Sequence, residues 1–136
     1  MFEWLNKYRI GLAEVDAQHE VFFQIGKALH EKIMASEYDD MTDYLDGLFI
    51  QLVEYTIYHF RCEEEYMSII EYPHIDHHKR LHTSFLVKLQ KLNDSSEMTK
   101  RQAMVYLKFI SDWILEHITV VDRRIKEFTL EVESIV

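Results

Sequence analysis

Apolar residues recur along most of the chain at alternating steps of three and four positions, which is the spacing of an α-helix with one buried face. The pattern predicts four helices, at about 16–36, 42–71, 73–93 and 97–131. Asp16 is the expected N-cap of the first helix. Pro73 separates the second and third helices, because proline interrupts a helix but suits the first turn of the next one.

Four helices joined by short connections favour an all-α fold, an up-down-up-down antiparallel four-helix bundle. Residues 1–15 precede the first helix as an N-terminal arm, and its apolar residues are expected to pack it against the bundle: Phe2, Trp4, Leu5, Ile10 and Leu12. A chain of 136 residues with 48% hydrophobic content predicts one domain, 1–136, with one core.

The formal net charge of −9, from 15 basic and 24 acidic residues, disfavours nucleic acids and anionic membranes as partners. The apolar runs are too short to span a bilayer, and the start MFEWLNKYRI does not resemble a signal peptide. The single cysteine, Cys62, cannot form an internal disulfide and is interpreted as a small buried apolar residue. These features predict a cytoplasmic protein.

Four of the eight histidines lie within the stretch EYPHIDHHKRLH, Glu71 to His82. His78 and His82 continue the apolar stripe of the third helix, whereas His77 projects with polar neighbours and is expected in solvent. A pair formed by His74 and His78 is the weaker alternative, because His74 stands at the helix start.

Each of the four predicted helices places at least one histidine on its apolar face, and two of them add an acid. The inward set is His19, His59, Glu63, His78, His82, His117 and Asp122. A single inward histidine is usually a hydrogen-bonded core residue, and His30 is interpreted in that way. Seven such groups are too costly to bury without a common partner, so the pattern predicts a metal centre.

Spacing along the helices supports this centre and predicts one distortion. Residues four apart, such as His59 with Glu63 or His78 with His82, differ in direction by about 40° and can meet one site. His117 and Asp122 are five apart and differ by about 140° on a regular helix. We therefore predict a π-bulge between them, which would return both side chains to one face.

Five imidazoles and two carboxylates exceed the needs of one ion, so two ions are expected. Two octahedral ions offer about twelve positions: five for histidine, four for two bridging carboxylates and two for a bridging oxo or hydroxo group. One position stays open for a small ligand. Because imidazole-rich ligation suits iron, the predicted cofactor is a pair of iron ions.

This constellation resembles the bacterial hemerythrins, the non-haem di-iron proteins that bind dioxygen. The matching motifs are GLAEVDAQH, HFRCEE, YPHIDHHKRLH and WILEHITVVD, which together extend over nearly the whole chain. The resemblance implies the distribution of the ligands: His78, His82 and His117 on one iron, His19 and His59 on the other, Glu63 and Asp122 bridging. It also implies that dioxygen binds reversibly at the iron with two histidines.

The function expected from this centre is oxygen transport, storage or delivery to an oxygen-using enzyme, without enzymatic turnover. Four-helix di-iron enzymes surround iron with glutamates, whereas five neutral nitrogens favour a milder centre. Trp113, Ile114 and Ile118 are candidates for the wall of a dry ligand pocket. Alternatives are an oxygen- or redox-sensing domain with a signalling partner, and a di-iron peroxidase or nitric-oxide-handling enzyme.

Overall fold

The computed structural model describes residues 3–94 and 98–135, which form helices and connecting turns. Within these ranges a short 3-10 turn, η1, comes first, and five α-helices and one π-helical segment, η2, follow. The elements are η1 (Asn6–Tyr8), α1 (Ala13–Ala35), α2 (Thr42–Ile69), α3 (Ile75–Asn93), α4 (Lys100–Glu116), η2 (His117–Asp122) and α5 (Arg123–Ile135). The last three are continuous and form one long helical rod.

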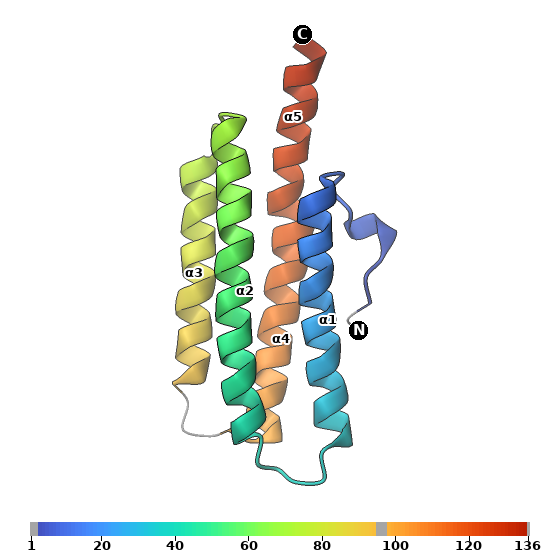
Figure 1. The fold of residues 1–136 in the computed structure, drawn as a ribbon, viewed down its shortest axis with the longest axis vertical. Coiled ribbons are helices and arrows are strands. Elements are labelled where there is room, and N and C mark those ends of the chain that lie inside the picture. Colours follow the sequence, from blue (N-terminus) through green and yellow to red (C-terminus); the bar gives the residue numbers. More distant parts are fainter. Residues whose placement is uncertain (1–2, 95–97, 136) are drawn as a thin grey trace.

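Consecutive helices of the bundle run in opposite directions (Figure 1). α1 packs against both α4 and α2, and α2 packs against α3. The predicted antiparallel four-helix bundle is confirmed. α5 continues the direction of α4 and extends past the ends of the other helices at the upper end of the view in Figure 1.

The start of α1 differs from the expectation, because the helix begins at Ala13 and Asp16 lies inside its first turns. Asp16 is therefore not the N-cap. Its buried carboxylate instead accepts hydrogen bonds from the backbone N–H groups of Ile10, at 2.8 Å, and Gly11, at 3.1 Å. Gly11 has φ +87°, a conformation that glycine adopts without strain. The carboxylate thus ties the arm to the helix.

Two other helix starts also differ from the expected positions. α3 begins at Ile75 instead of 73, because the chain first makes a turn in which the N–H of Tyr72 donates to the carbonyl of Met67 at 2.9 Å. Glu97, the expected start of the last helix, lies outside the described residues. α4 begins at Lys100, where the hydroxyl of Thr99 accepts a hydrogen bond from the N–H of Gln102.

The core runs along the bundle axis, and the arm packs onto its side as predicted. Trp4 lies edge-on to Phe23, with ring centroids 5.3 Å apart, and Tyr8 stacks on Phe23 at 5.2 Å. Ile10 is buried in the same core, whereas Leu5 is exposed, contrary to the expectation. Phe2 lies outside the described residues. The arm therefore covers α1 through its aromatic residues.

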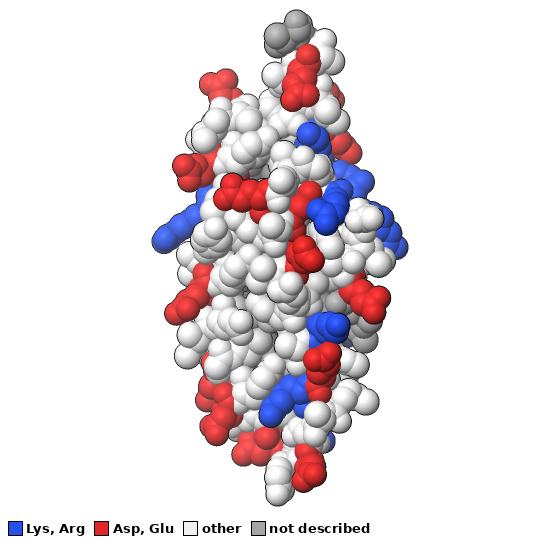
Figure 2. Space-filling model, turned by 45° about the vertical axis from the view of Figure 1, so that its right-hand side comes forward, with Lys and Arg blue, Asp and Glu red and all other residues white. Residues whose placement is uncertain are grey.

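The surface carries charges of both signs. On the face drawn in Figure 2, Lys and Arg side chains are interspersed among Asp and Glu side chains. Within the described residues, every helix is too short or too polar to cross a lipid bilayer.

Candidate metal centre

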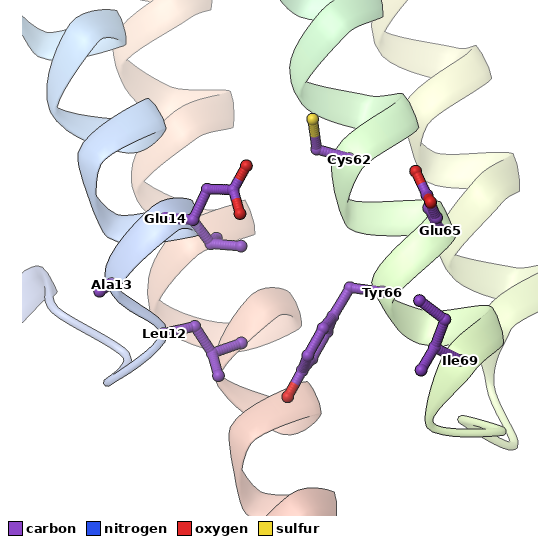
Figure 3. A pocket seen from close by; sticks show the side chains of 8 residues that line it. Leu12, Ala13, Glu14, Cys62, Glu65, Tyr66 and Ile69 are labelled. Atoms are coloured by element: carbon purple, nitrogen blue, oxygen red, sulfur yellow. The ribbon is translucent and has the colours of Figure 1, made fainter.

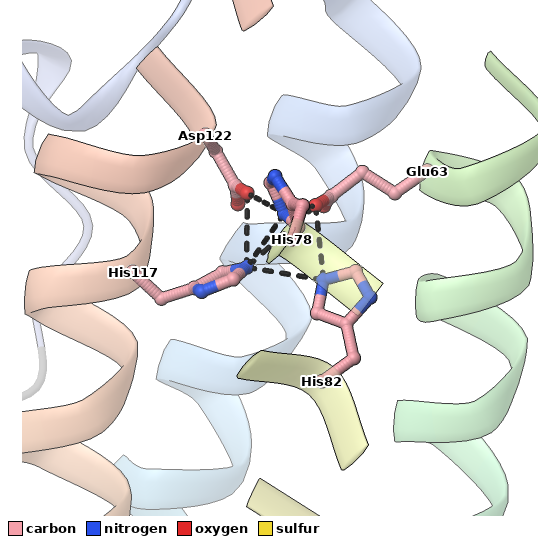
Figure 4. A group of neighbouring side chains, drawn as sticks. All are labelled: Glu63, His78, His82, His117 and Asp122. Carbon is pink, nitrogen blue, oxygen red and sulfur yellow. Dashed lines mark hydrogen bonds and ion pairs between the residues drawn. The ribbon is translucent and has the colours of Figure 1, made fainter. Parts of the chain in front are cut away.

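All seven residues of the predicted inward set are buried and meet in the middle of the bundle. Each has at most 4% of its surface exposed. Their ligand atoms form two overlapping groups, and within each group these atoms lie within 4.8 Å of one another. The first group, shown in Figure 4, is Glu63, His78, His82, His117 and Asp122; the second is His19, His59, Glu63 and Asp122.

The predicted distortion of the last helix is confirmed, because His117–Asp122 is a π-helix between α4 and α5. The wider turn compensates for the five-residue spacing and points both end residues toward the bundle axis. His117 Nε2 lies 2.9 Å from Asp122 Oδ1 as a result.

Glu63 contacts both groups with different oxygens. Its Oε1 lies 2.7 Å from His78 Nε2 and 3.2 Å from His82 Nε2. Its Oε2 lies 2.8 Å from His59 Nε2, on the same helix. The two oxygens of this carboxylate therefore face different sets of imidazoles.

Asp122 divides its oxygens in the same way. Its Oδ1 lies 2.9 Å from His117 Nε2 and 3.0 Å from His78 Nε2, and its Oδ2 lies 2.8 Å from His19 Nε2. Glu63 and Asp122 thus each place one oxygen toward the group that holds His78 and His117 and the other toward the group that holds His19, which is the arrangement of bridging ligands between two ions.

The spacing of the imidazole Nε2 atoms is better explained by a shared metal ion than by hydrogen bonds between the imidazoles. His117 Nε2 lies 3.2 Å from both His78 Nε2 and His82 Nε2. Two nitrogens that each lie about 2.1 Å from one ion, at right angles, are about 3.0 Å apart. At most one proton can lie between two facing imidazole nitrogens, so three such nitrogens around one point favour a shared cation.

The remaining potential ligand atoms are buried and make no hydrogen bonds within the described residues. Within the described part of the chain, His19 Nε2 and all four carboxylate oxygens of Glu63 and Asp122 have no hydrogen-bond partner. Several of these atoms lie within 3 Å of one another, yet the contacts lack hydrogen-bond geometry. Atoms that converge in this way are satisfied by ions placed between them.

The electrostatics of the chain alone also favour positive charge at the centre. Burial by itself lowers the pKa of His117 and His19, but the contacts with Asp122 and Glu63 outweigh burial and raise these pKa values to about 10 and about 9. Burial lowers the pKa of His59. Although burial opposes ionisation of Asp122, the neighbouring imidazoles hold the pKa of this carboxyl well below its usual range. The carboxylates thus attract cations, either protons or metal ions.

The other histidines lie outside the cluster. His74 and His77 are exposed, so His78 pairs with His82 and not with His74. His30 is only half-buried on α1, so the interpretation of His30 as a core residue is wrong.

Two ring stacks orient the imidazoles of the three-histidine group. Phe60 stacks on His82 with ring centroids 3.7 Å apart and planes 5° apart. Trp113 stacks on His117 at 4.2 Å and 14°. These contacts restrict the rotation of each imidazole about its side-chain bonds.

A small apolar cavity of about 10 Å³ adjoins the two-histidine group, between His19 and His59. The three predicted wall residues, Trp113, Ile114 and Ile118, line this cavity. Phe22 and His117 line it as well. Sequence reasoning missed Phe22, although its position three residues after His19 on the same stripe indicated it.

Two further residues were not singled out from the sequence. Gln18 Oε1 lies 2.6 Å from His59 Nδ1, and Glu64 Oε2 lies 2.8 Å from His82 Nδ1. Each directly precedes or follows a predicted ligand on its helix. Helical periodicity does not indicate such contacts, because these side chains point sideways toward a neighbouring helix.

A larger cavity, about 480 Å³, lies apart from the buried cluster, between the start of α1 and the second half of α2 (Figure 3). Leu12, Tyr66 and Ile69 line it, and so does Cys62. Cys62 is half-buried at this cleft and not fully buried as expected. Its thiol belongs to neither group of potential metal ligands.

Comparison with known proteins agrees with this geometry. Residues 10–128 match the model of the hemerythrin HHE cation binding domain. A bacteriohemerythrin from Clostridium acetobutylicum is 32% identical over 127 residues, which cover 90% of this chain and 97% of that protein. A myohemerythrin from Sipunculus nudus is 30% identical, covering 82% of this chain and 88% of that protein, and a bacteriohemerythrin from Campylobacter jejuni is 28% identical, covering 84% of each. The chain belongs to the hemerythrin family.

Proposed function

We propose that this protein binds dioxygen reversibly at a non-haem di-iron centre, for oxygen transport, storage or delivery. The observation that carries the proposal is that Glu63 and Asp122 each place one oxygen toward the three-histidine group and the other toward the two-histidine group. The family supports iron as the metal and dioxygen as the ligand.

In this proposal His78, His82 and His117 hold one iron and His19 and His59 hold the other. Glu63 and Asp122, which face both groups of imidazoles, would bridge the two irons. When bound, the pair of ions supplies an open coordination position and the electrons with which dioxygen is held. The open position would belong to the iron held by His19 and His59, because these residues supply one nitrogen fewer than His78, His82 and His117.

The surroundings of this position support binding without further reaction. Phe22, Ile114 and Ile118 line the adjoining cavity with apolar side chains, which exclude water from the ligand. Five imidazoles supply neutral nitrogen where a glutamate-rich site would supply negative charge. A less anionic ligand set stabilises high oxidation states less and favours release of dioxygen over its cleavage.

The test is a visible spectrum of the reduced, desalted protein under argon, then in air, then under argon again, with iron counted per chain. We expect two irons per chain and an absorption band that grows in air and fades under argon. Two irons with an irreversible change in air would overturn reversible binding and favour a redox enzyme or sensor.

A matched pair of variants connects this result to the site. His77 and His78 are neighbours on α3, but only His78 belongs to the cluster. His78→Ala is expected to lose iron and the reversible band, because its removal leaves the facing carboxylates buried and unpaired. His77→Ala should retain both. Equal iron content in the two variants would contradict the ligand assignment.

A further inference from the structure

The imidazoles of the centre differ in what their outer nitrogen, Nδ1, contacts. His82 Nδ1 lies 2.8 Å from a carboxylate oxygen of Glu64, and His59 Nδ1 lies 2.6 Å from the amide oxygen of Gln18. His19 Nδ1 is buried and has no hydrogen-bond partner within the described residues. Two of the five imidazoles are thus held by side chains of different charge.

Both contacts select the same tautomer. Neither a carboxylate nor an amide oxygen can donate a proton, so Nδ1 of His82 and of His59 must be the donor. In a neutral imidazole the lone pair is then on Nε2. These Nε2 atoms lie 3.2 Å and 2.8 Å from oxygens of Glu63, at the centre. Glu64 and Gln18 therefore aim each lone pair at a metal position.

The two acceptors belong to different halves of the centre. Glu64 acts on His82, in the three-histidine group, and Gln18 acts on His59, in the two-histidine group. The Glu64 side chain is 29% exposed, which leaves water access to its negative charge, whereas the neutral amide of Gln18 is almost completely buried. A negative charge on the outer nitrogen makes an imidazole a stronger electron donor and stabilises the more oxidised metal ion.

We propose that Glu64 and Gln18 are positioning residues that make the two metal positions electronically unequal. Glu64 stabilises the oxidised form of the three-histidine iron through His82, and Gln18 orients His59 while adding no charge to the iron that receives the ligand. This inference rests on the proposed di-iron site and deepens it, because it identifies residues that set the redox balance of the centre.

The test compares midpoint potentials in an anaerobic redox titration followed by visible absorption. Glu64→Gln keeps an acceptor for His82 but removes the charge, so we expect the midpoint potential to rise. Gln18→Glu adds a charge at the other half and is expected to lower it. Glu65→Gln is the control, because it removes the same charge one residue away, at the cleft between α1 and α2.

A second measurement does not depend on redox activity. Glu64→Ala removes the acceptor and the charge together, and loss of such an outer partner typically lowers metal affinity by about 10- to 100-fold. Competition of the Zn²⁺-loaded protein with a chelator measures this loss, and Glu64→Gln is expected to recover part of it. The recovery distinguishes hydrogen bonding from the general loss of a side chain.

The outcomes separate this inference from the proposed function. Wild-type protein that binds no metal overturns both. Two irons in the wild type, with the same midpoint potential in Glu64→Gln as in the wild type, overturn the inference alone. A shift of equal size in Glu65→Gln also overturns it, because the effect would then come from general surface charge.

Discussion

Three consecutive acids on α2 have three different environments. Glu63 is completely buried between the two groups of imidazoles, Glu64 contacts His82 from the outer side, and Glu65 is exposed at the cleft with α1. Successive helical residues differ in direction by about 100°, so one residue of displacement changes a side chain from an inner contact to an outer one. Chemical identity alone therefore does not define a ligand.

The position of Ile118 also decides its role, because this buried apolar side chain lines the cavity beside the two-histidine group. Its truncation should change how fast the oxygenated protein oxidises. Ile118→Ala enlarges the dry cavity beside His19 and His59 and admits water, so we expect the oxygenated form to oxidise irreversibly several-fold faster. The measurement is the decay of the oxygenated spectrum in air.

Ile110→Ala is the matched control for that variant. Ile110 is equally buried, on α4, but does not line the cavity. Both substitutions should destabilise the fold by about 2–5 kcal/mol. Equal oxidation rates in the two variants would show that lost stability, and not the cavity wall, controls the decay.

The π-helix is the decisive feature at the scale of the element. An extra residue within one turn keeps α4 and α5 packed on the bundle while His117 and Asp122 both face its axis. On a regular helix one of the two side chains would point about 140° away.

Deletion of exposed Val120 should therefore be tolerated by the metal centre. The deletion leaves His117 and Asp122 four residues apart, and on a regular α-helix that spacing returns both to one face. We expect two irons per chain to be retained and the π-turn to disappear from the structure of the variant.

Deletion of Val105 provides the contrast. Val105 is similarly exposed but lies in the regular part of α4. Its loss rotates the residues after position 105 by about 100° relative to those before it. His117 and Asp122 should then no longer point to the centre, and iron should be lost. Iron loss in the Val120 deletion with retention in the Val105 deletion would contradict the proposed origin of the π-turn.

At the scale of the whole molecule, the centre joins the four helical rods of the bundle, because every rod supplies at least one of its seven residues. The negative charge of the two buried carboxylates must be balanced by some cation. In the metal-free protein protons take this role, since Asp122 and Glu63 raise the pKa of His19 to about 9 and of His117 to about 10.

This balance predicts how the stability of the metal-free protein depends on pH. The folded-state pKa values lie above the unfolded value of 6.5, so the folded state binds these protons more tightly. The stabilisation is complete below pH 6.5 and is lost as the pH rises through about 9 and 10. We expect the urea midpoint of chelator-treated protein to fall over this range.

His117→Gln tests the origin of that slope. Without the His117 imidazole, the fall of the urea midpoint between pH 6.5 and about 10 should become smaller. A slope unchanged by this variant would show that His117 does not contribute to the pH dependence.

The hydrophobic period and the spacing of histidines and acids were sufficient to predict the helices, the inward set of seven residues and the π-turn, because these depend on the direction of side chains along one helix. Contacts between helices were decided only by the tertiary structure. The division of the Glu63 and Asp122 oxygens, the contacts of Gln18 and Glu64, and the start of α1 at Ala13 depend on how separate segments approach one another. Periodicity within a single helix carries no information about these distances.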